Sequence, residues 1–324
     1  MLNASQRPIK IIALSEIFQE IYAVKTLISI IGTTGIGKTK LAIQLAKHFR
    51  TEIISCDSRQ FFREMKIGTA TPSLEELAEV PHHFIGQLSV QDYYSIGQFE
   101  KEADQKIAEL FQMNDVVILV GGSMMYEKAV IRGLNDLPQA NDDHQKKLTG
   151  IWENHGIEAL RNLLEALDPQ YYAMVDRNNS RRLLRAIDII WQTGKTYTEN
   201  IAAQVKQKKF QVVRIGIEAP REIIYGKINH RVDVMMDDGL LQEAQQLMNF
   251  RNLVALQTVG YTELFRYFDG EWTLDFAIEE IKKNSRRFAK RQLTWYRKEE
   301  DIHWVNFQNS LEESLSLLQG LNIQ

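Results

Sequence analysis

The sequence is poor in the residues that cross-link or interrupt a chain. Among 324 residues it has a single cysteine, Cys56, and only six prolines. One cysteine forms neither an internal disulfide nor a multi-cysteine zinc site, so we expect a reducing, cytoplasmic location. Eighteen glycines and 44% hydrophobic residues exclude the collagen-like, disordered and small disulfide-stapled classes.

Long apolar runs and an excess of charge of one sign are also missing. The apolar stretch closest to the start, 11–14, is broken by Ser15 and Glu16. It therefore matches neither a signal peptide nor the roughly 20 residues that span a bilayer, and we expect no membrane partner. The formal net charge of −3 gives by itself no sign of a nucleic-acid partner.

Strand-like and helical segments alternate over the first part of the chain. Apolar runs of strand length at 26–31, 52–56 and 115–120 are followed in turn by helical patterns. This alternation predicts an α/β fold in which helices cover both faces of a parallel sheet and ligands bind at the carboxyl ends of the strands. Pro81, His82 and His83 are interpreted as a loop, and the histidines show no metal-ligand spacing.

The character of the chain changes from about 134 to 208, which is charge-rich, mostly helical and without a convincing strand. A strand at 210–217 then returns to the sheet, and most of the remainder is helical. The sequence therefore predicts a sheet core interrupted by a helical insertion, with a helical C-terminal part. The expected parts are an N-terminal extension at 1–24, the core at 25–133 and 209–324, and the insertion at 134–208.

A glycine-rich segment joins the first predicted strand to a helix. It reads Gly32-Thr33-Thr34-Gly35-Ile36-Gly37-Lys38-Thr39, which has the spacing, the Lys-Thr pair and the context of a phosphate-binding loop. In such a loop the backbone N–H groups surround an anion, Lys38 adds a positive charge, and the Thr39 hydroxyl suits Mg²⁺. The core is therefore expected to be P-loop NTPase-like, while the motif leaves the reaction class open.

Polar residues also follow the other two predicted strands. Asp57 ends the second strand and is suited to act as a general base or a magnesium ligand. An Asx turn explains its position equally well. The third strand ends on Gly121-Gly122-Ser123, without the acidic residue that an ATPase carries there. Cys56 is expected to face away from Asp57 as a small buried side chain.

Basic residues gather in segments that the net charge conceals. Residues 282–298 carry eight basic side chains and no acidic one, with Trp295 and Tyr296 among them. Cations beside aromatic rings favour a nucleic-acid partner over a solvated helix face. A second cluster, Arg181-Arg182-Leu-Leu-Arg185, lies in the insertion, where spacing alone favours a solvated face. Arg231 lies on a further predicted helix and is a third candidate.

These pieces together resemble the IPP transferase family, the tRNA isopentenyltransferases. The likeness runs from about residue 26 to 305. Two residues depart mildly from the family pattern, Thr33 where proline is common and Ser123 where threonine is frequent. Besides the phosphate loop, the matching motifs are 55–60, 67–70, 121–126, 181–185, 193–196, 228–231, 239–243, 258–261 and 289–295.

The resemblance implies transfer of a dimethylallyl group from dimethylallyl diphosphate to a tRNA adenine, without ATP hydrolysis. The acceptor is the exocyclic amine of the adenine 3′ to the anticodon. Asp57 would accept the proton, while Thr34, Lys38 and Arg231 would stabilise the departing diphosphate with Mg²⁺ on Thr39. A monomeric, bacterial form of the enzyme is expected, with the tRNA anticodon stem-loop as its partner.

The resemblance also assigns residues to each substrate. The diphosphate site comprises the loop residues Gly32, Thr33, Thr34, Gly35, Ile36, Gly37, Lys38 and Thr39. The tRNA contacts comprise Asp57, Ser58, Arg59, Gln60, Ser123, Arg181, Arg182, Arg185, Gly260, Tyr261, Arg286, Arg287, Lys290, Arg291 and Trp295.

Three other functions compete with this interpretation. An adenylate isopentenyltransferase would prenylate free AMP, ADP or ATP, but a small acceptor needs no basic helical insertion. A small-molecule P-loop kinase would use Asp57 as its base, but a nucleobase clamp is not identifiable in the sequence. An RNA-binding module with a relic loop would leave Lys38, Thr39 and Asp57 unexplained.

Overall fold

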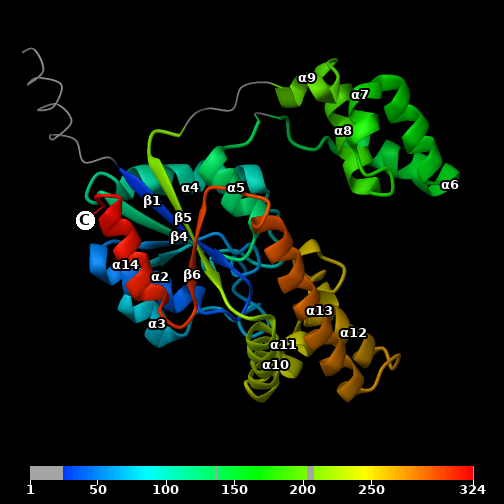
Figure 1. The fold of residues 1–324 in the computed structure, drawn as a ribbon. Coiled ribbons are helices and arrows are strands. Elements are labelled where there is room, and N and C mark those ends of the chain that lie inside the picture. Colours follow the sequence, from blue (N-terminus) through cyan, green and yellow to red (C-terminus); the bar gives the residue numbers. More distant parts are fainter. Residues whose placement is uncertain (1–24, 136, 203–207, 324) are drawn as a thin grey trace, which may run out of the picture. The chain divides into compact units, whose positions relative to one another are not determined.

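The computed structural model describes residues 25–135, 137–202 and 208–323 (Figure 1). The extension expected at 1–24 lies outside the described residues. The chain forms two compact units: the core unit, up to Ile131 and from Lys208 onward, and the insertion unit between them. The boundaries expected from the sequence fall close to this division. No helix in the described ranges is long and apolar enough to cross a membrane.

A six-stranded sheet lies at the centre of the core unit. Among the described residues every pair of neighbouring strands in this sheet is parallel, and the order is β3-β2-β4-β1-β5-β6. The central strands β1 and β4 are buried along their whole length, as continuous apolar strands are in parallel sheets. The α/β fold is thereby confirmed. The strands are β1 (Thr26–Gly32), β2 (Ile53–Ser55), β3 (His82–His83), β4 (Val116–Val120), β5 (Gln211–Glu218) and β6 (Ile302–Asn306).

The interpretation of residues 81–83 as a loop is wrong. His82 and His83 form the edge strand β3, in parallel register with Ile53 and Ile54 of β2. The Pro81 carbonyl begins the pairing by accepting a hydrogen bond of 3.0 Å from the Ile53 N–H. A strand of two residues is too short to show a periodic pattern, so only the pairing partner reveals it.

Some helices of the core unit pack against the sheet, and others form a second helical group. Ser95 caps α4 by accepting a hydrogen bond from the Gln98 N–H. Helices α10 to α13 pack around a second apolar cluster that includes Met65, Val232 and Leu264 (Figure 1). The helices are α2 (Lys38–Phe49), α3 (Leu74–Glu79), α4 (Ile96–Leu110), α5 (Met124–Arg132), α10 (Arg221–Asp237), α11 (Leu240–Gln246), α12 (Tyr261–Phe268), α13 (Leu274–Tyr296) and α14 (Ser310–Gly320), with short 3₁₀ turns at Met248–Phe250 and Val254–Leu256.

The insertion unit has a hydrophobic core of its own. Leu148, Leu160, Leu183 and Ile187 are fully buried in it. Its described residues contain helices and no strand, as the sequence predicts. These helices are α6 (Asp142–Leu167), α7 (Pro169–Met174), α8 (Ser180–Thr193) and α9 (Tyr197–Ala202).

Candidate active site

The glycine-rich loop connects the end of β1 to the start of α2. Gly37 precedes the helix at φ 114°, where glycine is favoured, and a side chain there would meet nothing within 4 Å. The loop backbone is thus open to a ligand at the helix N-terminus. The Lys38 ammonium group donates to the carbonyl oxygens of Gly32 and Thr33 at 3.2 and 2.7 Å.

Arg231 on α10 lies against this loop. One guanidinium nitrogen donates to the Thr34 hydroxyl at 3.2 Å and another to the Thr69 carbonyl at 3.4 Å. Burial lowers the pKa of Arg231, and the negative charge of Asp57 opposes that shift. Helix α10 therefore places a cation beside the loop, although Thr34 and Arg231 are separated by 197 positions.

Asp57 follows β2 and uses its two carboxylate oxygens differently. Oδ1 accepts a hydrogen bond of 3.1 Å from the Arg59 N–H, which is the Asx turn. Oδ2 lies beside Gly122, since a Cβ on that glycine would be 3.3 Å from it. Asp57 thus forms the turn and still faces the end of the neighbouring strand β4.

The ends of β2 and β4 are joined by two serines. The Ser123 hydroxyl accepts from the Ser58 N–H, and the two hydroxyl oxygens are 2.9 Å apart. Cys56 is fully buried, as expected, and burial raises the pKa of its thiol. The thiol is therefore not a reactive group of this site.

A cavity of about 630 Å³ opens over these strand ends. Its lining combines polar or charged side chains, among them Asp57, Arg231 and Thr34, with apolar ones, among them Met124 and Phe288. A cavity lined by both kinds of side chain suits a ligand with an anionic head and an apolar body. Eight of the residues predicted from the sequence line it, namely Thr34, Asp57, Ser58, Arg59, Ser123, Arg231, Gly260 and Arg291.

One wall of this cavity, the segment 66–69, was not among the predicted site residues. The Glu243 carboxylate accepts hydrogen bonds from the N–H groups of Lys66, Ile67 and Gly68 at 2.9, 2.8 and 2.9 Å. The Tyr261 hydroxyl donates to the same carboxylate at 2.7 Å. The motifs 67–70 and 239–243 were recognisable in the sequence, but their contact with each other was not.

Tyr261 was predicted to contact RNA, and its position corrects that prediction. The side chain is fully buried, and burial raises the pKa of its hydroxyl strongly. Its ring fills the space that a side chain at Gly68 would need. Tyr261 is therefore part of the wall that shapes the cavity, while the preceding Gly260 lines it.

Two other predicted RNA contacts are engaged by the protein itself. The Arg59 guanidinium donates to the carbonyl oxygens of Val254 and Ala255 at 3.0 and 2.9 Å. The Gln60 amide donates to the carbonyl oxygens of Thr69 and Ala70 at 3.3 and 3.1 Å. Arg59 still lines the cavity, whereas Gln60 holds the wall behind it.

Fewer cations of α13 are free of ion pairs than the composition of residues 282–298 indicates. Lys282 pairs with Asp233 and Glu279, Lys283 pairs with Glu280, and all these ion pairs are 3.0 Å or shorter. Acidic residues absent from 282–298 are thus supplied by the preceding turn and by α10. Arg286 likewise donates to the Asn229 side chain at 2.6 Å.

Three further cations of α13 (Arg287, Lys290 and Arg291) and Lys298 just beyond its end line a shallow groove of about 400 Å³. In the described ranges of the chain no ion pair is found for Arg287, Lys290, Arg291 or Lys298. Trp295 lies in the groove among them. We call these five residues the α13 groove. One of these five, Arg291, also lines the cavity described above, so the groove and the cavity share a residue of α13.

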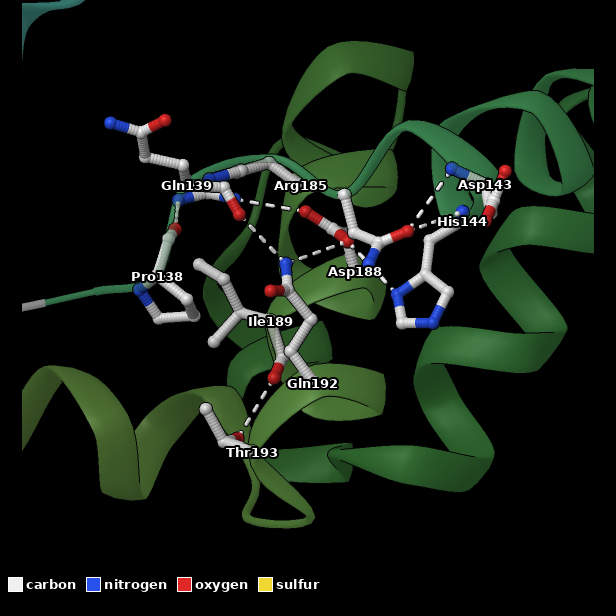
Figure 2. A network of polar contacts seen from close by, with 10 residues as sticks. Pro138, Gln139, Asp143, His144, Arg185, Asp188, Ile189, Gln192 and Thr193 are labelled. Atoms are coloured by element: carbon white, nitrogen blue, oxygen red, sulfur yellow. Dashed lines mark hydrogen bonds and ion pairs between the residues drawn. The ribbon is translucent and has the colours of Figure 1, made fainter.

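The arginines of the insertion unit divide in a similar way. Arg181 and Arg182 are exposed. Arg185 instead donates to Asp188 at 2.9 Å and to the Pro138 carbonyl, in a network shown in Figure 2. Asp188 is fully buried and also accepts from Gln192. Arg185 is thus held in this network by the protein itself, and its contact with RNA stays a prediction.

The donor set for a metal ion is sparse at the phosphate loop. No cluster of three or more His, Cys, Asp or Glu side chains able to hold a metal occurs in the part of the chain that the structure describes. Thr39 offers a hydroxyl in the first turn of α2. That set fits Mg²⁺ held mainly by substrate phosphates and water, and not a metal bound by protein ligands alone.

A parallel sheet with a phosphate loop, a carboxylate and an arginine around one cavity defines a P-loop-type enzyme that acts on a phosphate ester. The family model of IPP transferase matches residues 60–299, and the chain belongs to that family. The match begins after the phosphate loop, so the loop supports the assignment independently.

Individual relatives agree with this family. The chain is 50% identical over 294 residues to a tRNA dimethylallyltransferase of Christiangramia forsetii, covering 91% of this chain and 97% of that protein. It is 47% identical over 281 residues to tRNA dimethylallyltransferase 1 of Phocaeicola vulgatus, covering 87% and 94%.

Solved structures extend the similarity to the fold. The full-length tRNA isopentenylpyrophosphate transferase of Bacillus halodurans has a TM-score of 0.67 and 36% identity, with 91% of this chain and 96% of that chain covered. A eukaryotic dimethylallyltransferase acting on tRNA has a TM-score of 0.77 and 27% identity, covering 91% and 78%.

Proposed function

We propose that the protein transfers a dimethylallyl group from dimethylallyl diphosphate to the exocyclic amine of the adenine 3′ to the anticodon of tRNA. The observation that carries the proposal is the cavity that Asp57, Thr34 and Arg231 line together with apolar side chains such as Met124 and Phe288. Relatives named tRNA dimethylallyltransferase at 47 and 50% identity support the same reaction.

The reaction needs a cationic site for the leaving group and a base for the nucleophile. The adenine nitrogen attacks the allylic carbon, and the carbon–oxygen bond to diphosphate breaks with its electron pair on the oxygen. Lys38, Arg231 and the loop N–H groups stabilise that charge as it develops. The amine proton passes to Asp57, whose Oδ2 is not used by the Asx turn.

Mg²⁺ fits the loop as a partner of the diphosphate. Thr39 would supply one hydroxyl ligand, and the substrate phosphates with water would supply the others. An ion held in this way would supply positive charge next to the diphosphate.

The tRNA is expected on the basic surfaces that the protein leaves unpaired. The α13 groove offers four cations and one aromatic ring, which suits a phosphate backbone and a stacked base. Arg181 and Arg182 on the insertion unit are exposed and can pair with further phosphates. The reactive adenine must leave its stack to enter the enclosed cavity.

One assay separates this proposal from the alternatives. Labelled dimethylallyl diphosphate is supplied with unmodified tRNA, with AMP, or with neither. We expect label in tRNA only. Label in AMP but not in tRNA would identify an adenylate isopentenyltransferase, and ATP-dependent phosphorylation of a small molecule would identify a kinase. Tight tRNA binding without label transfer would leave an RNA-binding module.

The variant Asp57→Asn tests the proposed base. Asparagine keeps an oxygen for the Arg59 N–H but does not accept the proton, so turnover should fall by about 10²- to 10⁴-fold. The affinity for tRNA, measured by filter binding, should stay nearly unchanged. A large loss of tRNA affinity with normal turnover of bound tRNA would make Asp57 a recognition residue.

A further inference from the structure

Helix α13 carries a fully buried amide side chain, Gln292, among its basic residues. Its Oε1 accepts a hydrogen bond of 3.0 Å from the N–H of Thr34 in the phosphate loop. Its Nε2 donates a hydrogen bond of 2.8 Å to the carbonyl oxygen of Gly122 at the end of β4. These partners lie 258 and 170 positions away in the chain.

The chemistry at this position requires a neutral amide. Thr34 presents a donor and Gly122 an acceptor, and the glutamine amide answers each with the complementary group. A glutamate would direct a carboxylate oxygen at the Gly122 carbonyl oxygen. An apolar side chain would leave the buried Gly122 carbonyl and the partly buried Thr34 N–H without these partners.

Both groups that Gln292 holds belong to the proposed reaction site. The Thr34 hydroxyl receives the Arg231 guanidinium. A Cβ on Gly122 would lie 3.3 Å from the Asp57 carboxylate and 3.0 Å from the Gln292 amide nitrogen. The amide therefore lies between the leaving-group side of the site and the proposed base.

We propose that Gln292 is a positioning residue that fixes the phosphate loop relative to Asp57 and connects this spacing to helix α13. The same helix carries the α13 groove on its exposed side. A shift of α13 would therefore reach the phosphate loop through the hydrogen bond between Gln292 and the Thr34 N–H. This inference rests on the proposed transfer reaction and adds a residue that does not touch the substrates.

The test compares Gln292→Met and Gln292→Glu with Tyr296→Phe as a matched control. Tyr296 lies one turn further along α13, is also fully buried, and has a hydroxyl without a hydrogen-bond partner in the described structure. Removing that hydroxyl leaves the loop untouched, so kcat and KM should equal those of the unmodified protein. The measurements are kcat, KM for dimethylallyl diphosphate, the Kd for tRNA and the melting temperature of each variant.

We expect both Gln292 variants to lose about 10- to 100-fold in kcat/KM for dimethylallyl diphosphate, because a buried backbone pair loses its partner. Their tRNA Kd should stay close to that of Tyr296→Phe. In Gln292→Glu a protonated carboxyl regains one donor and one acceptor, so its activity relative to the unmodified protein should rise as the pH falls. The charged groups near this position are Asp57, which shares the space beside Gly122 with the Gln292 amide, and Arg231, which binds the Thr34 hydroxyl.

Two results would overturn the inference. A purely structural role would lower the melting temperature and the fraction of active protein, while kcat per titrated active site and KM stayed unchanged. The inference would also be overturned if kcat/KM were unchanged and the activity of Gln292→Glu, relative to the unmodified protein, did not vary with pH. Failure of the proposed function is distinguishable, because the unmodified protein itself would then transfer no label to tRNA.

Discussion

Lys38 holds its ammonium group in a half-buried position within the phosphate loop. Burial lowers its pKa to about 8, although the nearby Asp57 carboxylate acts in the opposite direction. The protonated form is the one that binds a diphosphate. Since the folded pKa lies below the ordinary value, this form is present below pH 8 and lost above it.

We therefore predict an upper limit near pH 8 in the profile of kcat/KM for dimethylallyl diphosphate, because that parameter reports groups of the free protein. In Lys38→Arg the guanidinium stays charged, so the decline above pH 8 should disappear even though overall activity falls. Steady-state assays across pH 6 to about 10 measure both profiles. The same decline in Lys38→Arg would assign it to another group.

Asp57 shows that two interpretations of one residue can both hold. The sequence left an Asx turn and a reactive carboxylate equally supported. The turn occupies Oδ1 only, and Oδ2 lies beside Gly122. The Asx turn is therefore confirmed, and the role of Asp57 as a base stays a prediction that the free position of Oδ2 allows.

Among the elements, the segment 66–69 depends most on distant contacts. The Glu243 carboxylate holds three successive backbone N–H groups, and Tyr261 packs against Gly68. A Cβ at Gly68 would lie 2.6 Å from the Tyr261 hydroxyl oxygen. The cavity wall thus has its position set by α11 and α12.

We predict that Gly68→Ala lowers the free energy of unfolding by about 1–3 kcal/mol, because the added methyl group overlaps a buried ring. Gly226→Ala is the matched control, since Gly226 lies inside α10 and a Cβ there meets nothing within 4 Å. That control should be stabilised by roughly 0.5–1 kcal/mol. Urea unfolding measures both, and equal stabilities would contradict the packing argument.

The sequence predicted where helices form better than it predicted what their side chains do. The helical C-terminal part expected from the sequence is present as α10 to α14, because helix formation depends largely on residues close together in the chain. Which cations of α13 stay available was not predictable. Asp233 pairs with Lys282 from another helix, and no pattern within 282–298 indicates this.

At the scale of the whole molecule, a buried ion pair joins parts of the core unit. Arg214 on β5 donates two hydrogen bonds to Glu127 on α5, at 2.9 and 3.1 Å, and both residues are buried. Ser29 on β1 donates to the same carboxylate, and Asp301 accepts from Arg214. Two strands, a helix and the segment before β6 meet at these charges.

We predict that Glu127→Leu lowers the free energy of unfolding by about 3 kcal/mol, because it leaves the Arg214 charge buried with only part of its compensation. The double variant Glu127→Leu with Arg214→Met should recover most of that loss, since it removes both charges. Urea unfolding of the three proteins measures the effect. A double variant less stable than Glu127→Leu would show that Arg214 stabilises the fold by itself.

The sequence by itself determined the parallel α/β core, the phosphate loop and the separate helical insertion. Each depends on residues close together in the chain, through strand length, helical periodicity or motif spacing. Only the tertiary structure decided which polar side chains face the cavity and which brace its walls. Gln292, Glu243 and Tyr261 take their partners from distant elements, so a one-dimensional pattern carries no record of those contacts.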